Sequence, residues 1–459
     1  MNGQPDAHVS ALEARMIDYA AQLAYDELGA DTVRHAKRRI LDTIGAALAG
    51  FDAPPARIAR TIAPAVAGGP RARIFGSLAA TSPEMAAFAN GAMLRYLDIN
   101  DTHRTVDGAH PSDNLGGLLA VAEATGRSGR DLILALAISY ELQCGFVDSV
   151  PFNDNGWDQP VPGVMACALA CGRLLGLDRE RLRHALALAV VPNLCTYQTR
   201  AGELSMWKGC AAANGARQGV FAAYLAAAGM SGPYDAFDGI FGLWNQTLGR
   251  PYEVAPFARA GDTFAVARTS IKKYPVRDSC QLPVDTALEL RAKVAAGDIA
   301  RLRIATYGSA HKGAVADPEL WAPRTRETAD HSMPVAVATA LIDGEVTPAT
   351  FAAERFLDDD VLALIGRTEI EISDDFSAQT PAVRNCRIEA LDGSGATHVA
   401  HRRLAAAEIG QGPSDAELEA KFHRLAAALP RAEREALVDA LWRLDALDDV
   451  GRLVDRLAL

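Results

Sequence analysis

The chain has 459 residues, about three times the length of a typical single domain, so two domains or one large domain with an insertion are expected. Asp and Glu (57) outnumber Lys and Arg (46), giving a net charge of −11, which argues against a nucleic-acid-binding protein. Hydrophobic residues make up 49% and charged residues 22% of the chain, as in a soluble globular protein with a large core. Disorder is excluded as the main state.

The seven cysteines are scattered, odd in number and sparse for the length, which favours reduced thiols over a disulfide framework. The absence of a Cys-x-x-Cys motif removes the usual spacing of structural zinc and iron–sulfur sites. Cys167 and Cys171 stand four apart on an apolar helix and could hold a metal in principle. Buried small hydrophobic side chains are the simpler interpretation of this pair, so no metal site is expected.

Residues 1–14 lack the basic start and apolar core of a secretory signal. Leu132–Ile138 is typical of the longest uninterrupted apolar stretches, far short of the roughly 18 residues of a membrane span. We therefore expect no membrane partner and a cytoplasmic location.

Helical spacing of apolar residues dominates the chain from about residue 9 to residue 246. Ser82-Pro83-Glu84 is a strong helix start, because serine caps the helix and proline is tolerated in its first turn. Pro and Gly clusters at residues 53–55, 68–70, 126–129 and 232–233 separate the segments. The clearest predicted helices are 32–48, 83–98, 129–150, 163–175 and 178–190.

The pattern changes after about residue 250. Short alternating segments predict strands at 302–307, 368–372 and 384–391, and helices are predicted at 284–296, 330–343 and 348–355. A capping box, Ser414-x-x-Glu417, opens a tail that reads as helical to the end. The predicted fold is mainly α: a large all-α domain (1–265 plus 406–459) with a smaller α/β domain (266–405) inserted into it.

The densest polar cluster lies at residues 98–114, between a helix ending near Tyr96 and a very apolar helix starting near Leu115. This segment holds two histidines and four aspartates, which are costly between buried helices unless they are exposed or used. A solvated loop, a metal site and an acid/base site in which carboxylates tune a histidine are the three interpretations. The metal interpretation lacks a His-x₃-His spacing or a second ligand motif.

Three further stretches carry candidate functional groups. Lys208 precedes a small-residue helix start and could meet an anion there, although a solvated lysine is the plainer interpretation. Residues 270–275 place two adjacent lysines at the expected domain junction, where ligands often bind. Residues 321–334 read as a loop entering a helix, with capping and domain docking as equal alternatives. An acidic, histidine-containing loop together with separated cations points to a small polyanionic substrate.

Four motifs resemble signatures of the MmgE/PrpD family, and they occur in the family's order over about 240 residues. That family includes 2-methylcitrate dehydratase, cis-aconitate decarboxylase and iminodisuccinate epimerase. The resemblance extends over essentially the whole chain, and it implies an α body with an inserted α/β domain, a homodimer, and catalysis without a metal or redox cofactor. The motifs are residues 95–102 with 110–114, Trp207-Lys208-Gly209, Ile271-Lys272-x-Tyr274-Pro275, and residues 325–332.

Transferred residue by residue, the resemblance implies that Asp98, Thr102 and His110 form one wall of the pocket, and that Lys208 and Lys272 form its cationic side. Dehydration of a hydroxy-tricarboxylate requires cations to stabilise growing carboxylate charge and an acid to protonate the leaving oxygen. His110 could supply the acid/base function, with Asp98 orienting or charging it, Thr102 bonding substrate and the lysines neutralising carboxylates. Additional substrate-binding candidates are Lys273, Tyr274, Arg326, Gln159 and His311.

The sequence departs from the family pattern at two expected histidines. Asp158 and Gln159 stand where several relatives place a second active-site histidine, and Arg277-Asp278-Ser279 follows where dehydratases continue toward another. His311 falls near a tyrosine position of a decarboxylase relative. The resulting hypothesis is a cofactor-independent lyase that dehydrates 2-methylcitrate or a related hydroxy-polycarboxylate. A cis-aconitate-type decarboxylase, an imino-dicarboxylate epimerase and a non-catalytic carboxylate-binding scaffold are the alternatives.

Overall fold

Helices begin at side-chain caps that are visible in the sequence. In the computed structural model, which describes residues 9–459 except the side chains of residues 407, 410 and 411, three helices open on complete capping boxes at Ser10, Ser128 and Ser414. In each box the serine accepts from a backbone N–H of the first turn, and the acidic side chain at that position accepts from the serine N–H. The box predicted at Ser414 is thus confirmed.

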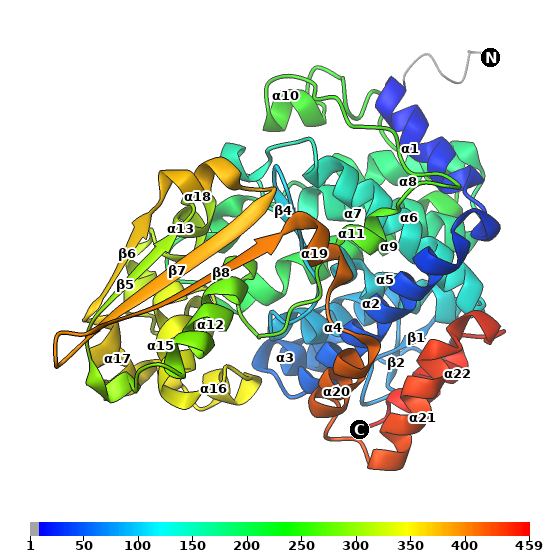
Figure 1. Cartoon of the computed structure of the whole chain (residues 1–459). Helices are drawn as coiled ribbons and strands as arrows, with labels where there is room; N and C mark the ends of the chain where they lie inside the picture. The colour runs from blue at the N-terminus through cyan, green and yellow to red at the C-terminus, as the bar shows by residue number, and fades with distance from the viewer. Residues whose placement is uncertain (1–8) are drawn as a thin grey trace.

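The larger body of the molecule is a stack of helices (Figure 1). Its mainly hydrophobic core is continuous from Met16 to Ile271 and includes side chains of the C-terminal helices from Leu418 to Leu457. Its N-terminal helices are α1 (Ala11–Gln22), α2 (Gly29–Ala49), α3 (Pro54–Ile62), α4 (Pro83–Tyr96), α5 (Leu115–Ala124), α6 (Gly129–Val147), α7 (Pro160–Leu175), α8 (Arg179–Val190), α9 (Ala211–Ala227), α10 (Leu243–Thr247) and α11 (Ala265–Arg268).

Small residues let these helices approach closely. A Cβ added at Gly219 of α9 would lie 2.7 Å from the Cβ of Cys167 on α7, and one at Gly91 of α4 would lie 2.7 Å from the Cβ of Ala213. Any larger side chain there would force the helices apart. The abundance of alanine and glycine is therefore used in packing the helices around α9.

The smaller body is built on a four-stranded sheet with the order β6-β5-β7-β8. The strands are β5 (Ile299–Thr306), β6 (Thr368–Ile372), β7 (Val383–Asp392) and β8 (Thr397–Ala405). Strand β5 pairs in parallel with β6 and antiparallel with β7, and β7 and β8 form a hairpin. The crossover between β5 and β6 carries α13 (Gly308–Ala314), α14 (Arg326–Ala329), α15 (Met333–Asp343), α16 (Pro348–Ala352) and α17 (Asp359–Ile365).

A second hydrophobic core, from Val276 to Ala400, lies under this sheet and is formed largely by α12 (Asp278–Arg291) and α15 (Figure 1). Helix α18 (Asp374–Gln379) connects β6 to β7. After β8 the chain returns to the larger body through α19 (Ala406–Gln411), α20 (Asp415–Leu425), α21 (Arg431–Trp442) and α22 (Gly451–Val454). The predicted fold class, a mainly α protein with an inserted α/β segment, is confirmed.

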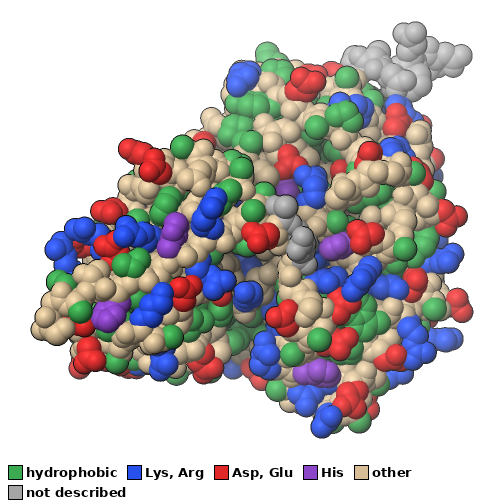
Figure 2. Space-filling view, in the orientation of Figure 1, with side chains coloured by type: hydrophobic (Ala, Val, Ile, Leu, Met, Phe, Trp, Pro, Cys, Tyr) green, Lys and Arg blue, Asp and Glu red, His purple; other side chains and the backbone are tan. Residues whose placement is uncertain are grey.

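Two two-stranded ribbons complete the described structure, β1 (Ala72–Arg73) with β2 (Ala80–Thr81) and β3 (His103–Arg104) with β4 (Gly108–Ala109). On the face shown in Figure 2, acidic and basic side chains are interspersed over both bodies. All seven cysteines are free, and Cys167 and Cys171 are fully buried with their sulfur atoms 3.8 Å apart. Within residues 9–459, the helices all fall short of the length and apolarity that crossing a membrane requires.

Candidate active site

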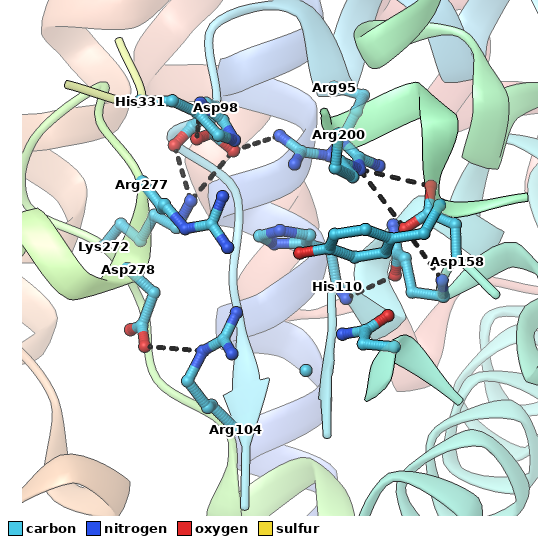
Figure 3. A pocket seen from close by; sticks show the side chains of 14 residues that line it. Arg95, Asp98, Arg104, His110, Asp158, Arg200, Lys272, Arg277, Asp278 and His331 are labelled. Carbon is cyan, nitrogen blue, oxygen red and sulfur yellow. Dashed lines mark hydrogen bonds and ion pairs between the residues drawn. The ribbon is translucent and has the colours of Figure 1, made fainter. Parts of the chain in front are cut away.

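A small cavity of about 30 Å³, partly open to solvent, lies where the two bodies meet (Figure 3). Five cationic side chains and three carboxylates line it, although the whole chain is strongly acidic. The excess of positive charge in its lining suits an anion. The lining residues are Arg95, Asp98, Arg104, Gly108, His110, Asn153, Asp158, Gln159, Tyr197, Arg200, Lys272, Arg277, Asp278 and His331.

Asp98 forms the most heavily charged corner. It follows α4 with φ near +53°, a left-handed conformation that is strained for a residue with a side chain and that recurs at functional sites. One carboxylate oxygen bonds Arg95, and the Lys272 Nζ lies 2.9 Å from that oxygen and 2.9 Å from the Asp98 carbonyl oxygen. Burial alone would raise the pKa of Asp98, but Arg95 and Lys272 hold it well below its usual range.

Lys208 lies behind this corner, in the 3₁₀ helix η5 (Met206–Gly209). Its Nζ donates to both carboxylate oxygens of Asp330, at 2.6 and 2.7 Å, across 122 residues of sequence. Asp330 also accepts from Nδ1 of His331 at 2.6 Å. Burial lowers the pKa of Lys208 to about 8 against the attraction of Asp330, and burial together with Lys208 lowers that of His331 to about 3. Lys208 thus reaches the cavity only through Asp330 and His331, since His331 lines it.

His110 stands at the end of β4, where the chain enters the 3₁₀ helix η2 (Pro111–Asn114). Its Nδ1 lies 2.7 Å from the Asp101 carbonyl oxygen, so Nδ1 carries the proton and Nε2 keeps its lone pair. Burial, followed by Arg95 and Lys272, lowers the pKa of His110 well below its usual range. The group that orients this imidazole is a backbone carbonyl rather than the Asp98 carboxylate, and the imidazole is neutral at neutral pH.

Gln159 fixes the backbone beside His110. Its Oε1 accepts from the His110 backbone N–H at 2.8 Å, and its Nε2 donates to Asp113 at 2.9 Å. The preceding Asp158 pairs with Arg200 at 3.2 Å, and an isolated bridge between Trp157 and Thr196 brings the 3₁₀ helix η4 (Tyr197–Arg200) alongside. The side of the cavity next to His110 is therefore formed by Asp158 and Gln159 together with Tyr197 and Arg200 of η4.

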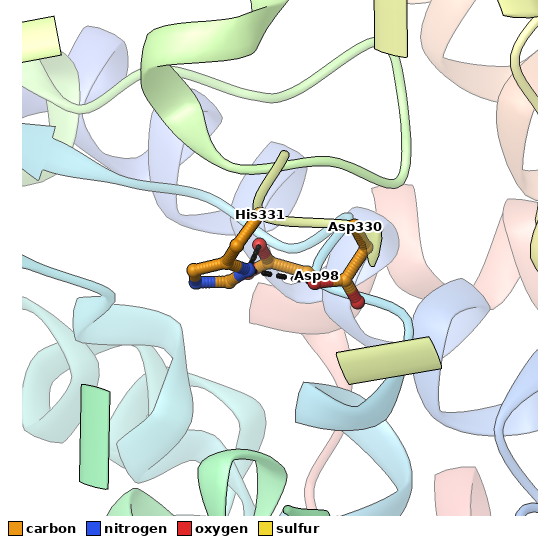
Figure 4. A group of neighbouring side chains, drawn as sticks. All are labelled: Asp98, Asp330 and His331. Carbon is orange, nitrogen blue, oxygen red and sulfur yellow. Dashed lines mark hydrogen bonds and ion pairs between the residues drawn. The ribbon is translucent and has the colours of Figure 1, made fainter. Parts of the chain in front are cut away.

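Asp98, Asp330 and His331 also form a group whose ligand atoms all lie within 4.8 Å of one another, the spacing of a metal site (Figure 4). Lys208 and Lys272 already provide the positive charge beside these carboxylates. Arg95 and Arg326 bond the same two carboxylates. A divalent cation would have to displace ammonium groups from both aspartates, so the donor set fits an internal ion-pair network better than a metal centre.

The structure brings four of the predicted site residues to the cavity wall: Asp98, His110, Gln159 and Lys272. Thr102 is buried nearby, but its hydroxyl faces the Ala109 carbonyl at 3.3 Å, and it lines a different cavity together with Arg268 and Arg384. His311 lies in α13 and is not among the lining residues.

Three other candidates point to partners outside the cavity. Lys273 and Tyr274 both contact Asp285, at 3.4 and 2.8 Å. Arg326 stacks over the Tyr96 ring, donates to the Tyr96 carbonyl at 2.9 Å and pairs with Asp330 at 3.1 Å. Arg326 therefore ties the sheet-containing body to the end of α4, close to the cavity without lining it.

Comparison with known proteins places this chain in a family. Residues 14–255 match the MmgE/PrpD N-terminal domain, and residues 274–444 match the MmgE/PrpD C-terminal domain. The chain belongs to the MmgE/PrpD family. It is 29% identical over 376 residues to the 2-methylcitrate dehydratase of Cupriavidus necator, covering 77% of this chain and 75% of that protein.

Two further relatives of this MmgE/PrpD chain have similar names. The 2-methylcitrate dehydratase of Escherichia coli K12 is 27% identical over 332 residues, which is 68% of each chain. A probable 2-methylcitrate dehydratase of Saccharomyces cerevisiae is 28% identical over 339 residues, covering 68% of this chain and 65% of that protein. The family resemblance read from the four motifs is thus confirmed.

Several cavity residues of this family member were missed in the sequence. His331 lies in the stretch 321–334, whose sequence fits helix capping and domain docking as well as it fits a functional role. Arg95 opens the first motif, and Arg277 and Asp278 were seen only as departures from a histidine pattern. Tyr197 and Arg200 lie in a short 3₁₀ helix, where the sequence shows no periodic pattern. The signal for this segment is the ion pair of Arg200 with Asp158, which is visible only in the structure.

Proposed function

We propose that this protein dehydrates 2-methylcitrate or a closely related hydroxy-polycarboxylate. The carrying observation is a neutral imidazole, His110, facing a cavity whose lining has more cations than carboxylates. The relatives named 2-methylcitrate dehydratase, at 27 and 29% identity, support a dehydratase role.

The chemistry needs a proton removed from a carbon next to a carboxylate. Such a proton is weakly acidic, and negative charge grows on the carboxylate as it leaves. Lys272 and Arg277 line the same cavity as His110 and can stabilise that charge without reorganisation. Cations fixed beforehand by the protein lower the barrier more than mobile ones in water.

We assign the base to Nε2 of His110. It takes the proton, the electrons of the C–H bond form the carbon–carbon double bond, and the carbon–oxygen bond breaks. The imidazolium then protonates the departing hydroxide, water leaves, and His110 returns to its neutral form. The low pKa of His110 keeps the imidazole in its free-base form before the reaction and makes the imidazolium a strong acid toward the leaving oxygen.

Lys208 has a positioning role in this proposal. It neutralises Asp330, which in turn orients His331 at the cavity wall. Asp98 holds Lys272 in place from the other side. These pairs keep the cationic wall rigid, so their role is to fix the geometry of the wall rather than to react with the substrate.

Proton NMR of the purified protein with 2-methylcitrate, citrate and other hydroxy-polycarboxylates tests this function. With citrate we expect loss of one methylene signal and appearance of a vinylic signal. With 2-methylcitrate, removal of the proton from the methyl-bearing carbon gives a double bond without a vinylic proton, so the methine signal should disappear and the methyl doublet should become a singlet. Neither change is expected with a His110→Ala protein prepared in the same way. Release of carbon dioxide would instead favour a decarboxylase, and exchange of the α-proton with deuterated water without net change would favour an epimerase. Binding without any of these reactions would favour the scaffold alternative.

The homodimer implied by the family resemblance is also a proposal. Light scattering coupled to size exclusion should give a mass close to twice that of the chain.

A further inference from the structure

Arg277 differs from the other cations of the cavity in its partners. Each of the other four has a carboxylate in ion-pair contact: Arg95 and Lys272 have Asp98, Arg104 has Asp278 at 3.5 Å, and Arg200 has Asp158 at 3.2 Å. Among the residues that the structure describes, the guanidinium of Arg277 has no such carboxylate, and its polar neighbour is the phenol of Tyr197. The charge of Arg277 is thus left for a ligand to balance.

The backbone around Arg277 holds the side chain in this place. Arg277 is the residue directly before α12, and its backbone N–H donates to the Asp330 carbonyl at 2.9 Å. In Figure 3 its guanidinium extends into the cavity on the side of Lys272 and faces His110. Arg200 lies nearby and carries the same charge as Arg277. A second cation bound beside Arg277 would therefore be repelled, whereas an anion would be attracted.

Gly313 of α13 provides the floor on which the guanidinium rests. A Cβ built at residue 313 would lie 2.7 Å from Nη2 of Arg277 and 3.0 Å from its Cζ. A side chain at that position would therefore push the guanidinium away. Because Gly313 is helical and has an ordinary negative φ, alanine is compatible with its backbone.

We propose that Arg277 binds one carboxylate of the polycarboxylate substrate and so determines which polycarboxylates this protein accepts. The inference rests on the proposed function only in taking the ligand to be a polycarboxylate. A planar guanidinium can make two parallel hydrogen bonds to one carboxylate, which a lysine cannot reproduce.

Calorimetric binding of tricarballylate tests the inference without turnover, since this tricarboxylate has no hydroxyl group to lose. Glutarate and methylsuccinate each lack one of its carboxylates. The variants are Arg277→Gln, Arg277→Lys and Gly313→Ala. Arg301→Gln, which removes an exposed arginine paired with Glu369 on the sheet, is the matched control.

We expect Arg277→Gln to weaken tricarballylate binding by at least about tenfold, the scale of a lost charge-assisted pair. At least one of the two dicarboxylates, the one lacking the carboxylate bound by Arg277, should change by less than about threefold on the same grounds. Arg277→Lys should recover part of the affinity, Gly313→Ala should lose part of it although the charge is kept, and Arg301→Gln should bind as the wild type does.

The inference fails if Arg277→Gln binds tricarballylate within about twofold of the wild type, less than one lost hydrogen bond to a charged group should cost. It fails equally if all three acids weaken by the same factor, because that pattern indicates a general disturbance of the cavity. If the wild type binds tricarballylate through Arg277 but dehydrates no hydroxy-acid, the proposed function is wrong while the assignment of Arg277 stands.

Discussion

The cavity has two walls that are stabilised in different ways. On the α-body wall, His110 is held by the Asp101 carbonyl and by Gln159, both from the same body. On the opposite wall, Lys272 pairs with Asp98 at the junction of the two bodies, and the pair of Asp330 with Lys208 crosses from one body to the other. The base is therefore set by one body, whereas the ion pair of Lys208 with Asp330 behind the cationic wall forms only when both bodies are docked.

This difference separates chemistry from stability. A hydrogen bond to a backbone carbonyl contributes about 0.5–1.5 kcal/mol, so removing the imidazole should change folding little. Removing one member of a buried ion pair leaves an uncompensated charge and costs about 3–5 kcal/mol. Substitution of His110 should then change mainly turnover, and substitutions at the buried ion pairs should change both turnover and stability.

The largest expected loss of activity follows from His110→Ala. Turnover should fall by about a hundredfold to ten-thousandfold, the usual range for a lost acid/base group, because the cavity keeps its cations but has no base. Steady-state kinetics by NMR and the melting temperature check the two halves of this expectation. His398→Ala, which removes a histidine paired with Asp392 on the sheet hairpin, is the control. Loss below threefold would remove His110 from the chemistry.

Lys208→Met should come next, with turnover reduced by about a hundredfold and the free energy of unfolding reduced by about 3–5 kcal/mol, because Asp330 is left charged and buried. The double variant Lys208→Met/Asp330→Asn separates the two effects, measured by denaturant unfolding and by kinetics. It should regain most of the stability and little of the activity. Recovery of both together would mean that the ion pair serves folding only.

The two walls also differ in how far sequence reasoning could predict them. Periodicity and the Ser-Pro pair located the start of α4 well: it runs from Pro83, as predicted, to Tyr96. The predicted cap is wrong in detail, because the Ser82 hydroxyl donates to the Glu84 side chain at 2.5 Å and accepts no backbone N–H of the helix. Helix α12 starts six residues before the predicted 284, because Pro283 lies inside it and reads in the sequence as a helix boundary. Strand β8 was missed because its outward positions carry charged side chains and its alternation is weak.

The limits for the site have the same origin. The short polar segment 98–114 concentrates His110 and Asp98, and a local pattern can find such a cluster. The pairing of Lys208 with Asp330 spans 122 residues, and no spacing rule connects them. Arg277 was visible only as a departure from a family pattern, since its importance lies in lacking a carboxylate partner. Local patterns thus predicted the α-body wall better than the wall that depends on docking.

The pH dependence should show a tenfold loss of kcat/KM for each pH unit above about 8. Lys208 must be charged to hold Asp330, and its pKa is lowered to about 8 by burial. On the acid side, activity should persist through the ordinary titration range of histidine, because the base His110 must be neutral and its pKa lies well below that range. Lys208→Arg should move the alkaline limit upward, and an unmoved limit would assign it to another group.

Stability should follow the opposite trend in the same window. The folded-state pKa of Lys208 is below its unfolded value of about 10.4, so between the two values the unfolded chain binds more protons. This residue's contribution to the unfolding free energy therefore rises as pH increases from about 8 to 10.4, while activity falls. Denaturant unfolding at several pH values, compared with Lys208→Met, isolates that contribution.

The smallest expected effect concerns Lys421 of α20, a buried residue behind both walls. Its Nζ lies 2.6 Å from Asp42 and donates to the carbonyls of Ile99 and Lys272, at 2.9 and 2.8 Å. It thereby connects the loop after Asp98 to the segment that carries Lys272. Lys421→Met should lower kcat/KM by about fivefold to tenfold per folded molecule, because small displacements of positioned groups slow catalysis.

Lys421→Arg and the double variant Lys421→Met/Asp42→Asn show whether Lys421 acts through position or only through stability. The double variant removes the carboxylate that Lys421→Met leaves buried and unpaired, so its stability should recover. The carbonyls of Ile99 and Lys272 lose their shared donor in the single methionine variant and in the double variant alike. If Lys421 positions the walls, kcat/KM stays low in the double variant and is partly restored by arginine, and Arg431→Met on the exposed side of α21 has no effect. If kcat/KM recovers fully with stability, the two walls are positioned without Lys421, and the direct pairs between them carry the alignment alone.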